Sequence, residues 1–278
     1  MYQHFKNIEK LYGDASVRLP NGIFRQLSQA IKNRSGRTNI KQVSFAYGYL
    51  VTTAFLYKYA HYVDLDNGTY IQNNDIKELL GYDKTTKTID RIIKKGGVLD
   101  ELELTATTKE FPIEFYTDDE ETINDIPLRI ISTFDEMSPD HINYSKIKQI
   151  VKNRNYVVKE PLFLTAFYEE SDYGTLYSIE RTHQITIKEF LKFMFSDDLN
   201  NIDFFMYGYF KSKCKGFDLN MRSLALGVIF GEMGMNANTF YNHLQVLKDK
   251  RYVSVHHKGW KVDASDLSSN DYYWLGVK

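Results

Sequence analysis

Residues 236–261 read NANTFYNHLQVLKDKRYVSVHHKGWK, and this stretch carries the strongest local pattern in the chain. Phe240, Leu244 and Leu247 have the spacing of one helical face, which predicts a helix with an apolar stripe. Asn236 precedes that helix and is a residue type that caps helix N-termini. The amide and hydroxyl side chains around it fall off the stripe. The stretch therefore predicts a capped helix with a polar outer face.

A short two-stranded ribbon is predicted after this helix. Tyr252–Val255 is rich in β-forming residues, His256–Gly259 is a polar tip, and Trp260–Val262 is a second short strand. A capped helix followed by a ribbon is the plan of a winged helix-turn-helix, whose recognition helix lies in the DNA major groove. In that plan the ribbon, or wing, lies along the DNA backbone. We therefore expect this stretch to bind DNA.

The composition is typical of a soluble protein with two domains or one large domain. Hydrophobic residues make up 43% and charged residues 26% of the 278 residues, which is enough apolar mass for packed cores. Cys214 is the one cysteine, which excludes an intramolecular disulfide and argues against a Cys-rich zinc site. No apolar run is long enough to cross a bilayer, and the first residues lack the apolar core of a signal peptide. We expect a cytoplasmic protein with no membrane partner.

Charge is unevenly distributed along the chain, although the net charge is only −1. Residues 1–110 carry 16 basic and 12 acidic residues, residues 111–200 carry 9 and 17, and residues 201–278 carry 10 and 7. Local patches, rather than totals, set the potential that a partner meets. Two mildly basic ends therefore flank an acidic middle, with ordinary charge scatter as the alternative interpretation.

A second helix, turn, helix and ribbon is predicted in the N-terminal half. A helix over residues 83–95 has an inward apolar stripe and is ended by Gly96-Gly97. Two strands follow at residues 98–104 and 111–115. This order of elements is similar to that predicted around residues 236–261.

Two polar segments have open interpretations. Residues 32–39 read KNRSGRTN and form either a solvated loop or a basic arm that touches phosphates or enters a minor groove. Asp118–Glu121 is either a solvated acidic loop or a docking surface for a basic partner.

The chain also contains an apparent internal repeat. FAYGYL at residues 45–50 matches FMYGYF at 205–210, and T-I-x3-I at residues 88–93 matches T-F-x3-L at 239–244. Two copies of one module are therefore predicted. The expected fold class is α+β, with two winged helix-turn-helix domains joined by a β-containing middle segment. The expected division is a helical lead and basic loop at 1–40, winged-helix domain 1 at 41–116, an acidic β-containing connecting region at 117–200, and winged-helix domain 2 at 201–278.

The residues after position 238 resemble a known class of DNA-binding proteins. The pattern T-F-Y-N-H-L-x2-L-x3-R-Y-V at residues 239–253 is similar to the recognition helix and wing start of many bacterial winged-helix regulators. The paired modules resemble, in architecture, tandem winged-helix proteins such as the replication initiator (Rep) proteins of plasmids and phages. That resemblance implies that modules bind the halves of a repeated origin site, and that one of them contributes to dimerisation.

The predicted DNA interface combines base-reading and phosphate-binding side chains. Asn238, Asn242 and Gln245 suit adenine edges, and Arg91 suits guanine. The lysines are expected to neutralise phosphates. The full predicted set is Lys84, Thr85, Thr86, Lys87, Arg91, Lys94, Asn236, Asn238, Thr239, Tyr241, Asn242, Gln245, His257, Lys258 and Lys261.

No motif in the sequence supports an enzyme. The chain has no P-loop, no Gly-rich dinucleotide-binding motif, no H-E-x-x-H and no Cys/His ligand set. We therefore expect no catalytic residues, no metal and no cofactor. The expected partners are double-stranded DNA, a second copy of the chain, and replication or transcription proteins. A transcriptional regulator is the alternative to an initiator, and a protein-interaction module without DNA binding is the alternative from another class.

Overall fold

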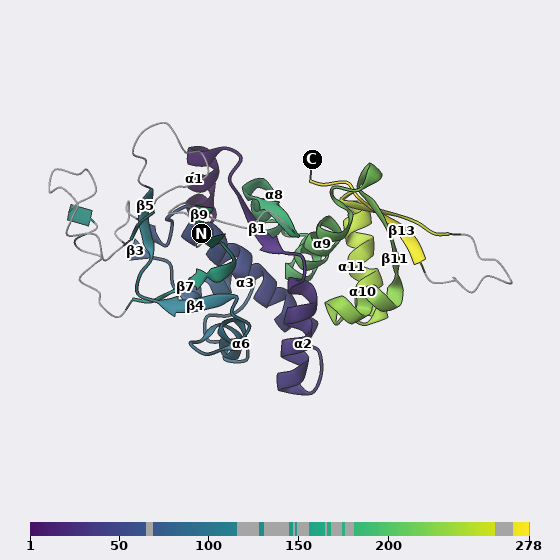
Figure 1. The fold of residues 1–278 in the computed structure, drawn as a ribbon, viewed down its shortest axis with the longest axis horizontal. Helices are drawn as coiled ribbons and strands as arrows, with labels where there is room; N and C mark the ends of the chain where they lie inside the picture. Colours follow the sequence, from purple (N-terminus) through teal and green to yellow (C-terminus); the bar gives the residue numbers. More distant parts are fainter. Residues whose placement is uncertain are drawn as a thin grey trace. The chain divides into compact units, whose positions relative to one another are not determined.

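The computed structural model describes residues 1–64, 69–115, 128–130, 145–146, 148, 156–164, 166–167, 174–175, 181–258 and 269–277 (Figure 1). Within these residues the fold is mixed α+β with small sheets. The chain divides into two compact units, and each unit is assembled from separate stretches of sequence. The first unit comprises Met1–Leu19, Tyr49–Glu180 and Gln184–Leu191, and the second comprises Pro20–Gly48, Arg181–His183 and Lys192–Lys278. The division predicted at residues 40, 116 and 200 is a different one and stays a prediction.

The C-terminal part of the second unit runs helix, strand, helix, helix, strand, strand. Its elements are α9 (Asn201–Cys214), β11 (Met221–Ala225), α10 (Leu226–Met233), α11 (Ala237–Asp249), β12 (Val253–His256) and β13 (Ser269–Trp274). In the antiparallel sheet β13 lies between β11 and β12, with Met221 opposite Tyr273 and Val253 opposite Trp274. The unit also contains α2 (Ile23–Ser35), the 3₁₀ turn η3 (Asp218–Asn220) and residues 40–48 of α3 (Ile40–Lys58).

The helix predicted from the apolar stripe is confirmed as α11. Asn236 caps it, because its side-chain oxygen accepts a hydrogen bond from the backbone N–H of Thr239 at 2.9 Å. Phe240, Leu244 and Leu247 are all buried, as the stripe predicts. The predicted strand after the helix is confirmed as β12. The second predicted strand, at residues 260–262, lies outside the described residues, and β12 pairs instead with β13.

The two similar hexapeptides contact each other in the core of the second unit. The ring of Tyr47 on α3 lies 5.4 Å from that of Phe204 and 5.6 Å from that of Phe205 on α9, between centroids. A Cβ atom added at Gly208 would lie 2.2 Å from the hydroxyl oxygen of Tyr47, so this close approach requires glycine. The likeness of these two segments therefore coincides with two buried helices that pack on each other.

His183 is a buried polar group in the same core. One ring nitrogen lies 2.9 Å from the hydroxyl of Tyr47, and the other lies 3.1 Å from the side-chain oxygen of Asn21. Burial and, to a smaller extent, the nearby Lys211 ammonium lower the pKa of His183 to about 3. The imidazole is therefore neutral at pH 7 and holds three segments of the unit together.

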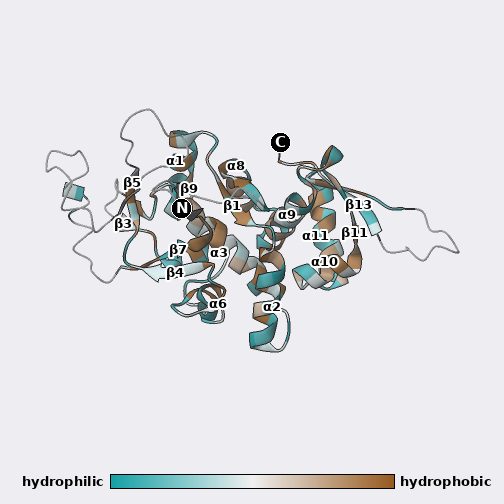
Figure 2. Cartoon of the chain, viewed as in Figure 1, coloured by the Kyte–Doolittle hydropathy of each residue, from teal (hydrophilic) through white to brown (hydrophobic). Residues whose placement is uncertain are grey.

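The first unit is a set of short elements around residues 49–58 of α3. Those residues of α3 are all buried, and Figure 2 shows hydrophobic positions along α3. Its helices are α1 (Tyr2–Tyr12), α4 (Asn73–Leu79), α5 (Asp90–Ile93), α6 (Val98–Glu101), the 3₁₀ turn η2 (Leu162–Leu164) and the start of α8 (Ile187–Met194). Its strands form two-stranded sheets: β1 (Ser16–Pro20) with β10 (Thr182–Thr186), β2 (Val63–Asp64) with β3 (Thr69–Tyr70), β4 (Thr105–Thr108) with β7 (Val158–Pro161), β5 (Pro112–Phe115) with β6 (Leu128–Ile130), and β8 (Ala166–Phe167) with β9 (Gly174–Thr175).

The predicted helix over residues 83–95 is wrong, because only Asp90–Ile93 is helical. The buried ammonium of Lys77 donates hydrogen bonds to the backbone oxygens of Lys84 and Thr86, both at 3.3 Å. Those oxygens would otherwise accept the N–H groups four residues ahead in a helix. The side chain of Asp83 accepts a hydrogen bond from the N–H of Thr85 at 2.7 Å, which favours a turn instead.

The predicted N-terminal ribbon is also wrong. Residues Val98–Glu101 form helix α6 instead of a strand, and the carboxylate of Asp100 accepts the N–H of Gly96 at 2.9 Å at the start of that helix. Residues Thr105–Thr108, which lie between the two predicted strands, form strand β4. The strand predicted at 111–115 is confirmed as β5, but it pairs with β6 and not with its expected partner. The acidic run Asp118–Glu121 lies outside the described residues.

Candidate nucleic-acid interface

The exposed face of α11 is polar and continuous. Asn238, Tyr241, Asn242 and Gln245 are exposed and recur at helical spacing opposite the buried stripe. Thr239 is half-buried beside them. Amide and phenol groups on one helical face offer both hydrogen-bond donors and acceptors. This face therefore has the chemistry needed to read base edges in a groove.

Some polar groups of α11 are already engaged in holding the helix. The side chain of Gln245 donates a hydrogen bond to Asp249 at 2.7 Å, one turn further on. His243 is 2.7 Å from the buried carboxylate of Asp203 on α9, a carboxylate that also accepts the N–H of Asn200 at 2.9 Å. Asn236 is committed to capping. The face is thus fixed in orientation by His243, and Asn242 remains an exposed amide near its centre.

The solvent-exposed side of the neighbouring helix α10 is formed mainly by small residues. Gly227, Val228 and Gly231 are exposed, and a Cβ atom added at either glycine would meet nothing within 4 Å. Glycine in a helix interior costs about 1 kcal/mol relative to alanine. No crowding within the described chain explains these glycines. Their absence of side chains leaves the α10 backbone open to close approach by a partner.

The start of the predicted wing carries cations that are partly neutralised. The ammonium of Lys258 lies 3.1 Å from the carboxylate of Asp271 on β13 and 3.0 Å from the hydroxyl of Ser223 on β11. The hydroxyl of Ser223 also donates to Asp271, and this hydrogen bond, followed by Lys258, holds the pKa of Asp271 below its usual value. His257 is exposed beside Lys258, and Lys261 lies outside the described residues. The wing start is therefore positioned by the sheet, with less free positive charge than its sequence suggests.

The N-terminal residues of the predicted interface do not lie on one helical face. Lys84, Thr85, Thr86 and Lys87 belong to a loop, Arg91 lies on the four-residue helix α5, and Lys94 follows its end. The ammonium of Lys84 is 3.1 Å from the carboxylate of Glu78. The predicted helix over residues 83–95 therefore does not bring these residues onto one face, although the cations themselves are exposed or half-buried.

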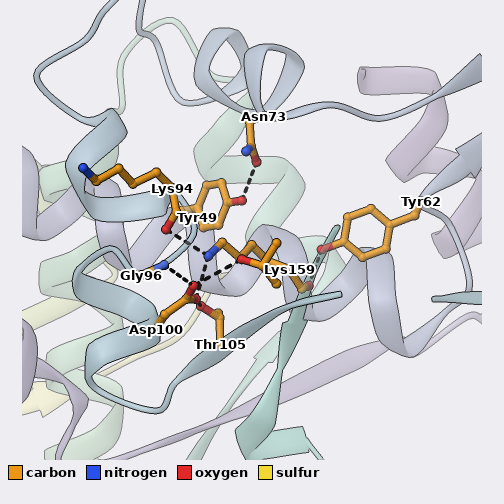
Figure 3. Close-up of polar contacts among 9 residues, drawn as sticks. Tyr49, Tyr62, Asn73, Lys94, Gly96, Asp100, Thr105 and Lys159 are labelled. Carbon is orange, nitrogen blue, oxygen red and sulfur yellow. Dashed lines mark hydrogen bonds and ion pairs between the residues drawn. The ribbon is translucent and has the colours of Figure 1, made fainter. Parts of the chain in front are cut away.

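A largely buried ion pair, drawn in Figure 3, contacts the segment between α5 and α6. The ammonium of Lys159 is 2.6 Å from the carboxylate of Asp100 and 3.2 Å from the backbone oxygen of Lys94. Burial raises the pKa of Asp100, but hydrogen bonds from Lys159, Thr105 and Gly96 outweigh it and hold that pKa below its usual value. The partners of this ion pair are backbone and side-chain groups of the segment from Lys94 to Thr105, so the cluster stabilises the turn between α5 and α6.

Figure 3 also shows two tyrosines whose hydroxyls brace this region. Tyr49 donates a hydrogen bond to Asn73 at 2.5 Å, and Tyr62 donates to the backbone oxygen of Lys159 at 2.7 Å. Burial raises the pKa of both tyrosines, so both hydroxyls stay protonated. Their contacts are structural, and sequence patterns give no signal for them because the partners are distant in the chain.

The part of the chain that the structure describes holds neither a cluster of metal-ligand side chains nor a helix of membrane-spanning character. Among those residues, no three His, Cys, Asp or Glu side chains gather closely enough to hold a metal ion. None of the described helices has the length and apolar character needed to cross a membrane. Comparison with known protein families, curated proteins and solved structures gives no match to this chain.

Proposed function

We propose that the chain is a sequence-specific double-stranded DNA-binding protein, and that the C-terminal part of its second unit is a winged helix-turn-helix. In this proposal α10 and α11 form the helix-turn-helix, α11 is the recognition helix, and the β12–β13 hairpin is the wing. The observation that carries the proposal is the exposed polar face of α11 on a helix that is capped, packed and oriented by its own unit.

Three further features support this assignment. The order helix, strand, helix, helix, strand, strand, with the last strand in the centre of the sheet, suits a hairpin that projects beside the third helix. The exposed glycines of α10 allow the helix backbone to approach a phosphate chain closely. Residues before Asp249 on α11 include no carboxylate that would repel DNA.

We further propose that the biological role is initiation of plasmid or phage replication at repeated origin sites. The paired modules predicted from the sequence suggest this role through their resemblance to Rep proteins. Because the predicted N-terminal helix and ribbon are wrong, only the C-terminal module now supports it, and transcriptional regulation is its alternative. The two roles differ in the DNA that they require: clustered direct repeats favour an initiator, and a single palindrome favours a regulator.

The test is selection of bound sequences from a pool of duplexes with a randomised core, using the full-length chain. The selected duplex and a scrambled duplex are then compared by fluorescence anisotropy between about 50 and 200 mM salt. We expect tighter binding of the selected duplex, with affinity that falls as salt rises. A chain that enriches no sequence and has no salt dependence would contradict the proposal and favour a protein-interaction module.

Asn242→Ala tests the role of α11 directly. Loss of an amide that contacts adenine should cost about 1–3 kcal/mol at the selected duplex and little at the scrambled one. Asn7→Ala, on helix α1 of the first unit, is the matched control and should leave both affinities unchanged. Equal behaviour of the two variants would remove α11 as the base-reading element.

A further inference from the structure

The last turn of α2 and the turn that follows it form a basic segment of the second unit, which we call the basic loop. We define it as residues 32–38, in which Lys32, Arg34 and Arg37 are exposed. Because α2 ends at Ser35, residues 32–35 of the predicted polar loop are helical. Gly36 turns the chain with a φ of 72°. The hydroxyl oxygen of Ser35 lies 2.7 Å from the backbone oxygen of Ile31 and 2.6 Å from that of Arg37, so its one hydrogen can be donated to either. The loop is therefore a fixed turn of the chain.

The basic loop lies against the turn that leads into α11. The hydroxyl of Ser28 on α2 donates a hydrogen bond to the backbone oxygen of Glu232 at the end of α10, at 3.0 Å. A Cβ atom added at Gly234 would lie 2.3 Å from the Cγ2 atom of Thr38. Asn236, the cap of α11, follows two residues after Gly234. Figure 1 shows α2 and α10 side by side in the second unit. Thr38, the last residue of the loop, thus lies beside the approach to the N-terminus of α11.

The charge of this region is one-sided. The sequence contains no aspartate or glutamate between Asp14 and Asp64, and residues 20–48 carry five basic residues. Glu232, at the end of α10, is already paired, because its carboxylate is 2.7 Å from both the ammonium of Lys213 and the hydroxyl of Tyr209. The N-terminus of α11 adds the partial positive charge of a helix dipole. A polyanion is the partner that fits such a surface.

We propose that Lys32, Arg34 and Arg37 bind phosphates of the same duplex whose bases α11 reads. The DNA-contacting surface then extends from α11 across the basic loop, although the two lie some two hundred residues apart in sequence. This inference rests on the proposed function, because it assumes that α11 faces DNA. Phosphate contacts fix the register of a protein on DNA and carry no base information.

The experiment uses the full-length chain with the triple variant Lys32→Gln/Arg34→Gln/Arg37→Gln. Anisotropy is measured with labelled selected and scrambled duplexes across the same salt series. The slope of log affinity against log salt should become shallower by up to about 2.7, since each lost phosphate contact contributes about 0.9. Both duplexes should lose affinity by the same factor, so that their ratio stays constant.

The matched control is Lys10→Gln/Lys109→Gln/Lys192→Gln, which removes three exposed lysines outside the basic loop and α11. Its salt slope should stay that of the wild type, and circular dichroism should show both variants folded. Equal slopes for the two triple variants would overturn the inference. If Asn242→Ala still abolishes discrimination in that case, the proposed function stands alone. A wild-type chain that binds neither duplex would overturn both.

Discussion

Substitution of Gly234 tests how closely the basic loop approaches the turn between α10 and α11. Gly234 has a φ of 65°, and an added Cβ atom would lie 2.3 Å from Cγ2 of Thr38 and 2.9 Å from Cβ of Ser28. Gly36 has a similar φ of 72°, but a Cβ atom there would meet nothing within 4 Å. Alanine at the two positions therefore shares the backbone strain and differs in the steric clash.

The expected losses of stability follow from these two terms. An alanine in the left-handed region costs about 1–2 kcal/mol, so Gly36→Ala should cost about that much. Overpacking adds about 1–3 kcal/mol, so Gly234→Ala should cost about 2–5 kcal/mol. Thr38→Ala removes the nearer of the two clashing atoms. In the Gly234→Ala background it should restore about 0.5–2 kcal/mol, while the contact with Ser28 remains.

The assay is urea unfolding followed by circular dichroism on the full-length chain. Because the two units can unfold separately, the transition that shifts is compared among the wild type, the three single variants and the double variant. The reasoning is refuted if Gly234→Ala costs no more than Gly36→Ala. It is also refuted if Thr38→Ala is equally costly with and without alanine at position 234, because contacting residues must show coupling.

Three further predictions concern stability. Asp100→Asn should lower the free energy of unfolding in urea by about 3–5 kcal/mol, because it leaves the buried Lys159 ammonium unpaired. In the wild type, the stability that the Asp100 carboxylate contributes should be lost as pH falls below about 4 and through the lowered pKa of Asp100. An unfolding free energy that does not change with pH in this acid range would contradict the prediction. His183 has a pKa of about 3 in the folded chain and an ordinary pKa of about 6.5 in the unfolded chain. Between these two pH values only the unfolded chain binds the proton, so the free energy of unfolding should fall by about 1.4 kcal/mol per pH unit as pH decreases. His183→Gln should remove this dependence in the same assay. Gly231→Ala should stabilise the fold by about 1 kcal/mol and so raise the melting temperature. A lower melting temperature would contradict the open space around Gly231.

The sequence predicts those elements whose signals are local. The cap at Asn236, the stripe of Phe240, Leu244 and Leu247, and the β-prone run after it all depend on neighbours within one or two turns. Each is therefore predictable from local residue types and their spacing. The outward face of α11, including Asn242, follows from the same periodicity.

The errors arise where a distant or buried group overrides local pattern. Ile89, Ile92 and Ile93 are all buried, as the stripe predicts. Most of the predicted helix is nevertheless a loop, because Lys77 donates hydrogen bonds to two of its backbone carbonyl oxygens. A buried lysine that acts as a backbone donor leaves no periodic signal. The contact between Thr38 and Gly234 joins segments far apart in the chain, so one sequence alone could identify the basic loop but could not place it.

The interleaved composition of the second unit has a consequence for its synthesis on the ribosome. The ring of Phe24 on α2 packs against Phe205 and Tyr209 on α9, at centroid distances of 5.2 and 5.3 Å. At about 5–20 residues per second, translation from residue 24 to residue 209 takes on the order of 10–40 s. During that interval the apolar side of α2 is synthesised but cannot pack against α9. The nascent chain is therefore a natural client for chaperones that shield hydrophobic segments, and slowing translation between these two stretches should increase its aggregation.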